Sequence, residues 1–239
     1  IPELAGDKSE AFYETRQGLE RLARMLGKQK PDTIVIATPH NLRLEGAIGI
    51  VTSEFTEGSL RENDKEISLR CNCDPALAKL IYLDSKKQRL PVIAANYGTS
   101  TGESSCMPMD WGTLIPLWFF THGKKSKLKT VIVTPSRETP FSDLIHFGRV
   151  IAKAAENSEK RVAFVASADQ AHTHRLDGPY GFHPSAKEFD MMLKRAVKEN
   201  ELERLFNLPS KLVEDAKPDS LWQMAVLHGV LETTSMKVQ

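Results

Sequence analysis

The chain has 239 residues, of which 41% are hydrophobic and 26% are charged, values that are ordinary for a globular domain. Its 32 Lys and Arg residues nearly balance 31 Asp and Glu residues, and a net charge of +1 gives no indication of nucleic-acid binding. The apolar run at residues 114–120 is too short to span a membrane. Three cysteines, an odd and small number, favour a reducing cytoplasm over secretion.

Apolar spacing predicts helices and strands that alternate along the whole chain. The first helix is expected over residues 8–28, and a buried β-branched strand is expected after it at residues 33–37. Further strands are expected at residues 46–54, 66–71, 92–95, 130–134 and 161–166. Further helices are expected at residues 75–87, 113–122, around 144–151, from 185 onward, and at 221–231. No repeat or linker divides the chain, so we expect one α/β domain over residues 1–239, with a mostly parallel or mixed central sheet flanked by helices.

Polar side chains follow three of these predicted strands. His40 comes soon after the strand at residues 33–37, Asn96 and Tyr97 come after the next candidate, and His172 comes after a third. In α/β folds the ligand sits beyond the carboxyl ends of the strands, so parallel neighbours would bring the two histidines to one edge. Neutral imidazole binds iron and zinc and also carries protons near neutral pH. The alternative is that each histidine caps a strand end through a backbone hydrogen bond.

Three further features are candidates for the same region. His174 forms a His-x-His pair with His172, although a loop leaves the direction of both side chains open. The Gly/Pro-rich loop at residues 177–184, which contains Tyr180, is long enough to cover a pocket. Asp219 precedes the final predicted helix and, taken by itself, is most simply a carboxylate that stabilises the helix N-terminus.

Five segments, in fixed order, carry a family resemblance over nearly the whole chain. They are Thr38-Pro39-His40, Asp110-Trp111-Gly112-Thr113-Leu114-Ile115-Pro116-Leu117, Ser167-Ala168-Asp169-Gln170-Ala171-His172-Thr173-His174, Asp177-Gly178-Pro179-Tyr180-Gly181, and the closing stretch from Leu221 to Gly229. In order and spacing they resemble the class III extradiol ring-cleavage dioxygenase family of the catalytic-subunit-B type, which includes the Memo-like relatives.

This resemblance implies a non-haem Fe(II), with zinc as the alternative metal, held by two histidines and one carboxylate. His40 matches the second histidine ligand, Asp219 stands in the place of the family's glutamate ligand, and His172 matches its acid–base histidine. The family's first histidine ligand lies upstream of the position of Ile1, so an incomplete ligand set and poor metal binding are expected of these residues alone.

The resemblance also implies a substrate pocket, and one departure from the family falls within it. Trp111 stands where many members have a histidine, just as Asp219 is shorter than the family's glutamate. The residues expected to line the pocket are Asn96, Tyr97, Asp110, Trp111, His174 and Tyr180.

The implied activity is extradiol cleavage of a catechol-type or aminophenol-type ring by O2, an oxidoreductase reaction of aromatic catabolism. Expected partners are the small aromatic substrate and O2, with no nucleic acid, no membrane, and a homo-oligomer left open. One alternative is a Memo-like metal-binding or protein-interaction module without dioxygenase activity, which the departures at Asp219 and Trp111 favour. The other alternative is a metal-dependent hydrolase that uses the same ligands on a non-aromatic substrate.

Overall fold

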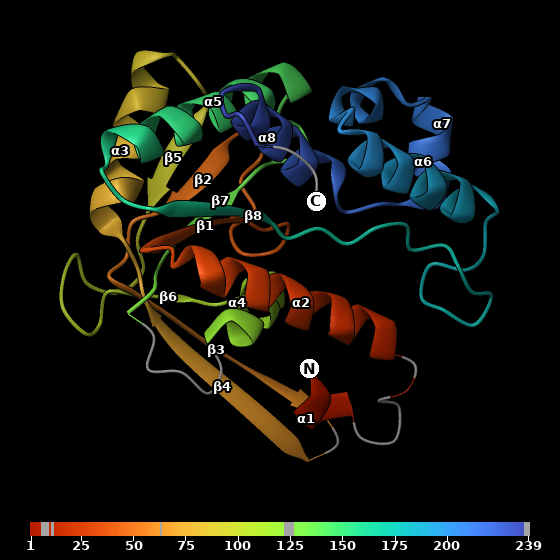
Figure 1. Cartoon of the computed structure of the whole chain (residues 1–239), viewed down its shortest axis with the longest axis horizontal. Helices are drawn as coiled ribbons and strands as arrows, with labels where there is room; N and C mark the ends of the chain where they lie inside the picture. The colour runs from red at the N-terminus through yellow and green to blue at the C-terminus, as the bar shows by residue number, and fades with distance from the viewer. Residues whose placement is uncertain (6–9, 11, 63, 122–126, 237–239) are drawn as a thin grey trace.

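Two β-sheets lie among the helices in the computed structural model of the chain, which describes residues 1–5, 10, 12–62, 64–121 and 127–236 (Figure 1). A central five-stranded sheet has the order β5-β2-β7-β1-β8, and a three-stranded sheet has the order β4-β3-β6. The strands are β1 (Thr33–Ala37), β2 (Ile48–Val51), β3 (Phe55–Glu62), β4 (Lys65–Asn72), β5 (Val92–Ala95), β6 (Cys106–Pro108), β7 (Lys129–Thr134) and β8 (Val162–Ala166).

Helices cover both faces of the central sheet. Figure 1 shows α3, α5 and α8 on one face, with α2, α4 and the smaller sheet on the other. The helices are α1 (Pro2–Ala5), α2 (Tyr13–Gln29), α3 (Pro75–Lys87), α4 (Trp111–Thr121), α5 (Phe141–Asn157), α6 (Ser185–Glu199), the 3₁₀ helix η2 (Leu202–Asn207), α7 (Ser210–Ala216) and α8 (Leu221–Glu232). No helix in the described ranges is both long and apolar enough to cross a membrane.

Strand β1 lies between two parallel neighbours, and this position explains its uninterrupted apolar sequence. It pairs in parallel with β7 on one side and with β8 on the other. All five of its residues are buried, because both faces of the strand are covered. Val35 and Ala37 pack into the core under α3, α5 and α8, whereas Ile34 and Ile36 pack into the core that includes α4.

Strand β2 reverses the direction of the sheet. It pairs antiparallel with β7 and parallel with β5, so β2 and β5 both run opposite to β1, β7 and β8. The prediction of one α/β domain with a mixed central sheet flanked by helices is therefore confirmed. The carboxyl ends of β1, β7 and β8 meet at one edge, and the carboxyl end of β5 lies at the other.

Some predicted elements differ from the structure in extent. The strand expected at residues 46–54 is confined to β2, and the first long helix starts at Tyr13, with residues 8, 9 and 11 of its expected range outside the described residues. Strands β3 and β6 are not predicted by the sequence pattern. Strand β3 reads Phe-Thr-Glu-Gly-Ser-Leu-Arg-Glu, and its exposed polar positions and internal glycine hide the strand period.

Helices α5 and α8 approach closely because a glycine of each faces the other. A Cβ atom built on Gly229 would lie 1.9 Å from the backbone oxygen of Ile145, and one built on Gly148 would lie 2.1 Å from that of Val226. Both clashes are with backbone, which has little room to move. This contact sets the distance of α8 from α5.

We therefore expect Gly229→Ala to lower the free energy of unfolding by about 1–3 kcal/mol, as overpacked cores do. Gly18→Ala is the matched control, because a Cβ at Gly18 in α2 meets no atom within 4 Å and replaces a poor helix former. Thermal melts of both variants check this. Equal melting temperatures for the two alanine variants would show that the α5–α8 contact tolerates a methyl group.

Candidate active site

His40 and Asp219 meet beyond the carboxyl end of β1. Thr38 and Pro39 carry the chain from β1 to His40, whose Nε2 lies 3.9 Å from Asp219 Oδ2. Asp219 is brought there by backbone pairing with Asp169, just after β8: the Asp219 N–H donates to the Asp169 oxygen at 2.9 Å, and the reverse bond is 3.3 Å. Two residues far apart in sequence, one of them a buried carboxylate, thus share one edge of the sheet.

Arg137 is a member of this site that the sequence analysis missed. Its Nη2 lies 2.6 Å from Asp219 Oδ1, and its guanidinium lies 5.1 Å from the centre of the Trp222 ring. A buried carboxylate is costly without a partner, and Arg137 supplies the opposite charge. The signal was available, since Arg137 follows the carboxyl end of β7, as His40 follows that of β1.

A cavity of about 320 Å³ opens beside these three side chains, within the size range of small-molecule sites. Its lining combines an imidazole, two guanidinium groups, two carboxylates and a phenol ring. The lining residues are Pro39, His40, Leu42, Arg43, Leu44, Pro135, Ser136, Arg137, Glu138, Tyr180 and Asp219.

Asp110 and Trp111 flank His40 from the start of α4. Thr38 donates its hydroxyl proton to Asp110 Oδ2 at 2.6 Å, which ties this helix end to the end of β1. The Trp111 ring centre lies 5.0 Å from that of His40, and the side chain is about half exposed. Of these two expected pocket residues, Trp111 presents an aromatic surface beside His40, whereas Asp110 positions the loop that carries it.

Both ring nitrogens of His172 face oxygen acceptors. Nδ1 lies 2.5 Å from the backbone oxygen of Lys217, and Nε2 lies 3.0 Å from Asp169 Oδ2. Burial lowers the pKa of His172, but the hydrogen bonds to Asp169 and Lys217 and the nearby charges outweigh it, so the pKa is raised. Its ring centre is 5.0 Å from that of Tyr180, which also lines the cavity at His40. The arrangement favours a protonated His172 next to the cavity.

Three expected pocket residues lie elsewhere. His174 turns to Asp190 of α6, with Nε2 2.9 Å from Oδ2, and does not line the cavity at His40. Asn96 and Tyr97 follow β5, which runs opposite to β1, so they lie at the other edge of the sheet. Asn96 there accepts a hydrogen bond from Ser53 at 2.6 Å. The assignment of Asn96 and Tyr97 to the substrate pocket is corrected on this ground.

His40 Nε2 and Asp219 Oδ2 are donor atoms of the kinds that bind zinc and ferrous iron, but they lie farther apart than neighbouring ligands of one ion. Bonds from Zn²⁺ to imidazole nitrogen or carboxylate oxygen are about 2.0–2.2 Å, which puts two neighbouring donors about 3.0–3.4 Å apart. The observed separation of 3.9 Å is wider, so the two side chains would have to approach by about 0.5–1 Å to share an ion. Across the described ranges, no group of three or more His, Cys, Asp or Glu side chains is placed to hold a metal. Among the described residues, His40 and Asp219 are therefore two candidate donors and not a complete ligand set.

Comparison with known proteins adds family evidence to this geometry. The family described as the catalytic LigB subunit of aromatic ring-opening dioxygenase matches residues 2–239. Protein CA_C1420 of Clostridium acetobutylicum is 27% identical over 238 residues, which are 99% of this chain and 50% of that protein, so the chain spans about half the length of this relative. A crystal structure of the uncharacterized protein JW3007 from Escherichia coli K12 shares the fold, with a TM-score of 0.58 and 18% identity over 90% of this chain and 82% of that one.

We expect the substitution Asp169→Asn to change the pKa of His172. The variant removes the carboxylate that raises the pKa of His172, so that pKa should fall. An NMR titration of the His172 ring signals measures this pKa. Asp190→Asn is the control, because Asp190 pairs with His174 and not with His172.

The raised pKa of His172 also determines how this residue makes the free energy of unfolding depend on pH. His172 contributes stability below its unfolded pKa of about 6.5, and this contribution is lost as pH rises through the folded value. Asp169→Asn should flatten this part of the pH dependence of unfolding. An unchanged His172 pKa in the variant would show that Asp169 does not control the proton.

Proposed function

The chain belongs to the family of the catalytic LigB subunit of aromatic ring-opening dioxygenase, and from that premise we propose that it cleaves a catechol-type or aminophenol-type ring with O2 at a ferrous ion. The observation that carries the proposal is the approach of His40 to Asp219, 3.9 Å apart beside a cavity of about 320 Å³. An imidazole and a carboxylate are two of the three ligands of the facial site used by non-haem iron oxygenases.

His40 Nε2 and Asp219 Oδ2 would hold the metal. Arg137 contacts the other carboxylate oxygen, so it balances the charge of Asp219 and leaves Oδ2 facing His40. Ferrous iron, when bound, supplies the redox chemistry with O2 and orients the oxygens of the substrate. Zinc is the alternative metal for the same donors.

Two aromatic side chains suit a flat substrate: Tyr180 lines the cavity, and Trp111 lies outside the lining but against His40. Trp111 lies beside His40 and Tyr180 lies beside His172, and both are about half exposed. Stacked or edge-on contacts with such rings contribute about 0.5–1.5 kcal/mol beyond area burial. In this proposal the substrate ring packs against Trp111 or Tyr180, with its hydroxyl groups directed to His40 and Asp219.

His172 is the proposed proton carrier, and its contacts favour the acid half of that role. The raised pKa means that the folded protein favours the protonated ring, and Nε2 lies 3.0 Å from Asp169 Oδ2. Moving that proton to a substrate oxygen requires the ring to exchange Asp169 for the substrate. Acting as a base first would require the hydrogen bond to Asp169 to open and the ring to lose its proton.

Two observations favour a second candidate function. The Arg137–Asp219 ion pair already neutralises the carboxylate, and the described residues supply two metal donors. Both features suit a Memo-like metal-binding or interaction module, and a metal-dependent hydrolase would use the same donors. Oxygen uptake with a panel of catechols separates the dioxygenase from both, and metal analysis then separates the hydrolase from a metal-free module.

We place the same activity in the cytoplasm, within aromatic-compound catabolism. Cys71, Cys73 and Cys106 are all free thiols in the structure, and burial raises the pKa of Cys71 to about 11 and that of Cys73 to about 12. Buried thiols without disulfides are compatible with a reducing compartment.

The proposal predicts different losses for the two histidines. His40→Ala removes a metal donor, so iron content and oxygen uptake should fall together. His172→Ala removes a proton carrier, so iron should stay while turnover falls about 10²–10⁴-fold, the usual worth of general acid–base help. Anaerobic iron loading, metal analysis and oxygen uptake on the full-length protein check this.

His146→Ala is the matched control. His146 lies on α5, contacts Gln88, and belongs to neither cavity lining nor ligand set. It should retain both iron and turnover, with melting curves confirming that all three variants fold. Loss of iron from His172→Ala as complete as from His40→Ala would mean that His172 is itself a ligand.

A further inference from the structure

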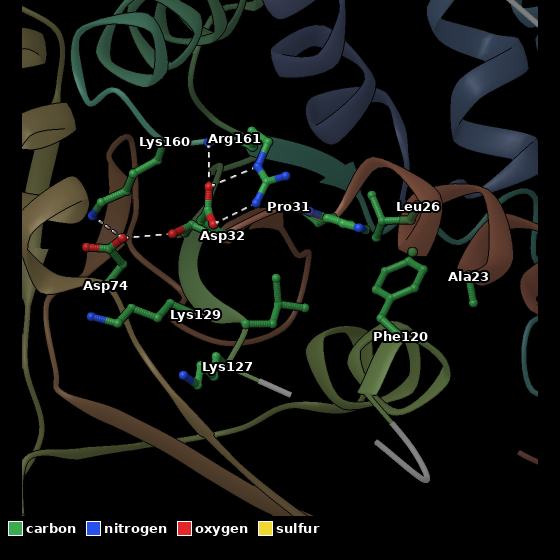
Figure 2. Close-up of a pocket in the computed structure, with 14 residues that line it drawn as sticks. Ala23, Leu26, Pro31, Asp32, Asp74, Phe120, Lys127, Lys129, Lys160 and Arg161 are labelled. Atoms are coloured by element: carbon green, nitrogen blue, oxygen red, sulfur yellow. Dashed lines mark hydrogen bonds and ion pairs between the residues drawn. The ribbon is translucent and has the colours of Figure 1, made fainter. Parts of the chain in front are cut away.

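A second cavity, of about 500 Å³, lies at the opposite edge of the central sheet from His40 (Figure 2). Thr33 and Lys129, the first residues of β1 and β7, line it together with Arg161, which precedes β8. Residues of α2 and Phe120 of α4 complete the lining. Its volume falls in the range of small-molecule sites, and nothing in the proposed ring-opening reaction uses it.

Both carboxylates of this cavity are already neutralised. Asp74 is almost fully buried and accepts hydrogen bonds from Lys160 Nζ at 2.6 Å and from Thr33 Oγ1 at 2.8 Å. Burial raises the pKa of Asp74, but these bonds and the Leu77 N–H outweigh it, so the pKa is lowered. Asp32 is exposed and accepts hydrogen bonds from Nε and Nη2 of Arg161. Two of the cations in the lining are therefore matched by two anions.

Three further lysines line the same cavity and add positive charge. In the described part of the chain, no carboxylate lies within ion-pair distance of Lys30, Lys127 or Lys129. Figure 2 shows Lys127 and Lys129 on the same side of the cavity as the Asp74–Lys160 pair. This side of the cavity therefore carries an excess of positive charge.

The other side of the cavity is apolar. Ala23 and Leu26 of α2 lie next to Phe120 of α4 there, as Figure 2 shows, and Pro31 and Leu128 also contribute to the lining. A cavity with a cationic side and an apolar side is complementary to a ligand that has an anionic head on an apolar body. Lysines act on phosphate as point charges, and aromatic rings favour a flat apolar partner.

We propose that this cavity is a binding site for a small phosphate monoester with an aromatic or similarly flat apolar body. The phosphate lies beside Lys127 and Lys129, and the apolar body packs against Leu26 and Phe120, while Lys30 adds to the positive charge of the lining. Neither part alone satisfies both sides of the cavity, so the two are required together. The site is separated from His40 by the length of the β-strands, so ligand binding here is measurable without any ring-opening activity.

Isothermal titration calorimetry on the full chain, with 2-naphthyl phosphate as the probe, tests the proposal. Inorganic phosphate and 2-naphthol supply the head and the body separately, and 2-naphthoate distinguishes a general anion site from a phosphate site. We expect 2-naphthyl phosphate to bind about tenfold or more tightly than the other three, because it alone combines a phosphate head for the lysines with an apolar body for the other side of the cavity.

The double variant Lys127→Gln/Lys129→Gln should weaken 2-naphthyl phosphate binding about tenfold or more, because it removes two charge partners of the head. Lys194→Gln/Lys198→Gln is the matched control, since it removes the same charge from exposed positions of α6 and should leave the affinity unchanged. Leu26→Ser tests the apolar side and should weaken 2-naphthyl phosphate while leaving inorganic phosphate as it was.

Four results would overturn the proposal. Equal weakening by the two lysine pairs would show only bulk charge attraction, and equal affinity for inorganic phosphate would show no role for the apolar side. Unchanged binding in Lys127→Gln/Lys129→Gln would place the ligand elsewhere. Equal affinity for 2-naphthoate would replace the phosphate monoester by aryl anions in general.

Discussion

The parallel pairing of β1 with both β7 and β8 is the constraint on which the candidate active site depends. Because the three strands run the same way, the segments that follow them emerge at one edge of the sheet. His40 follows β1, Arg137 follows β7, and the stretch from Asp169 to His172 follows β8. Residues from three distant parts of the chain are thereby assembled without any side chain having to reach across the fold.

Asp219 does not follow a strand of this sheet. Its backbone pairs with that of Asp169, and this pairing holds it at the same edge. The bridge fixes a carboxylate that is almost fully buried, and a buried charge is tolerated only beside a partner. Arg137 at 2.6 Å and His40 at 3.9 Å are the groups that meet its two oxygens. The guanidinium and the imidazole approach different oxygens, so the carboxylate oxygen that faces His40 is not the one that Arg137 contacts.

Sequence reasoning found the parts of the site that follow from strand ends. The β-branched runs identified β1 and β8, and their following histidines do lie at the same edge. The prediction that Asn96 and Tyr97 line the substrate pocket was wrong. The apolar pattern of β5 predicts a strand but not its direction, and its parallel pairing with β2 makes it run opposite to β1. The sequence also could not predict the hydrogen bonds of His172. One acceptor is the backbone oxygen of Lys217, which is far away in sequence and comes near His172 only in the folded chain.

The central claim is that a divalent metal binds between His40 and Asp219, and paramagnetic broadening tests it most directly. Substoichiometric Mn²⁺ is added to the uniformly ¹⁵N-labelled full-length protein, and amide signals are followed by NMR. The strongest broadening is expected for the signals of His40, Arg137, Asp169 and Asp219, with clearly weaker broadening for those of Asn96 and Tyr97 at the opposite edge. Broadening centred elsewhere, or none at these four residues, would contradict a metal site at this edge.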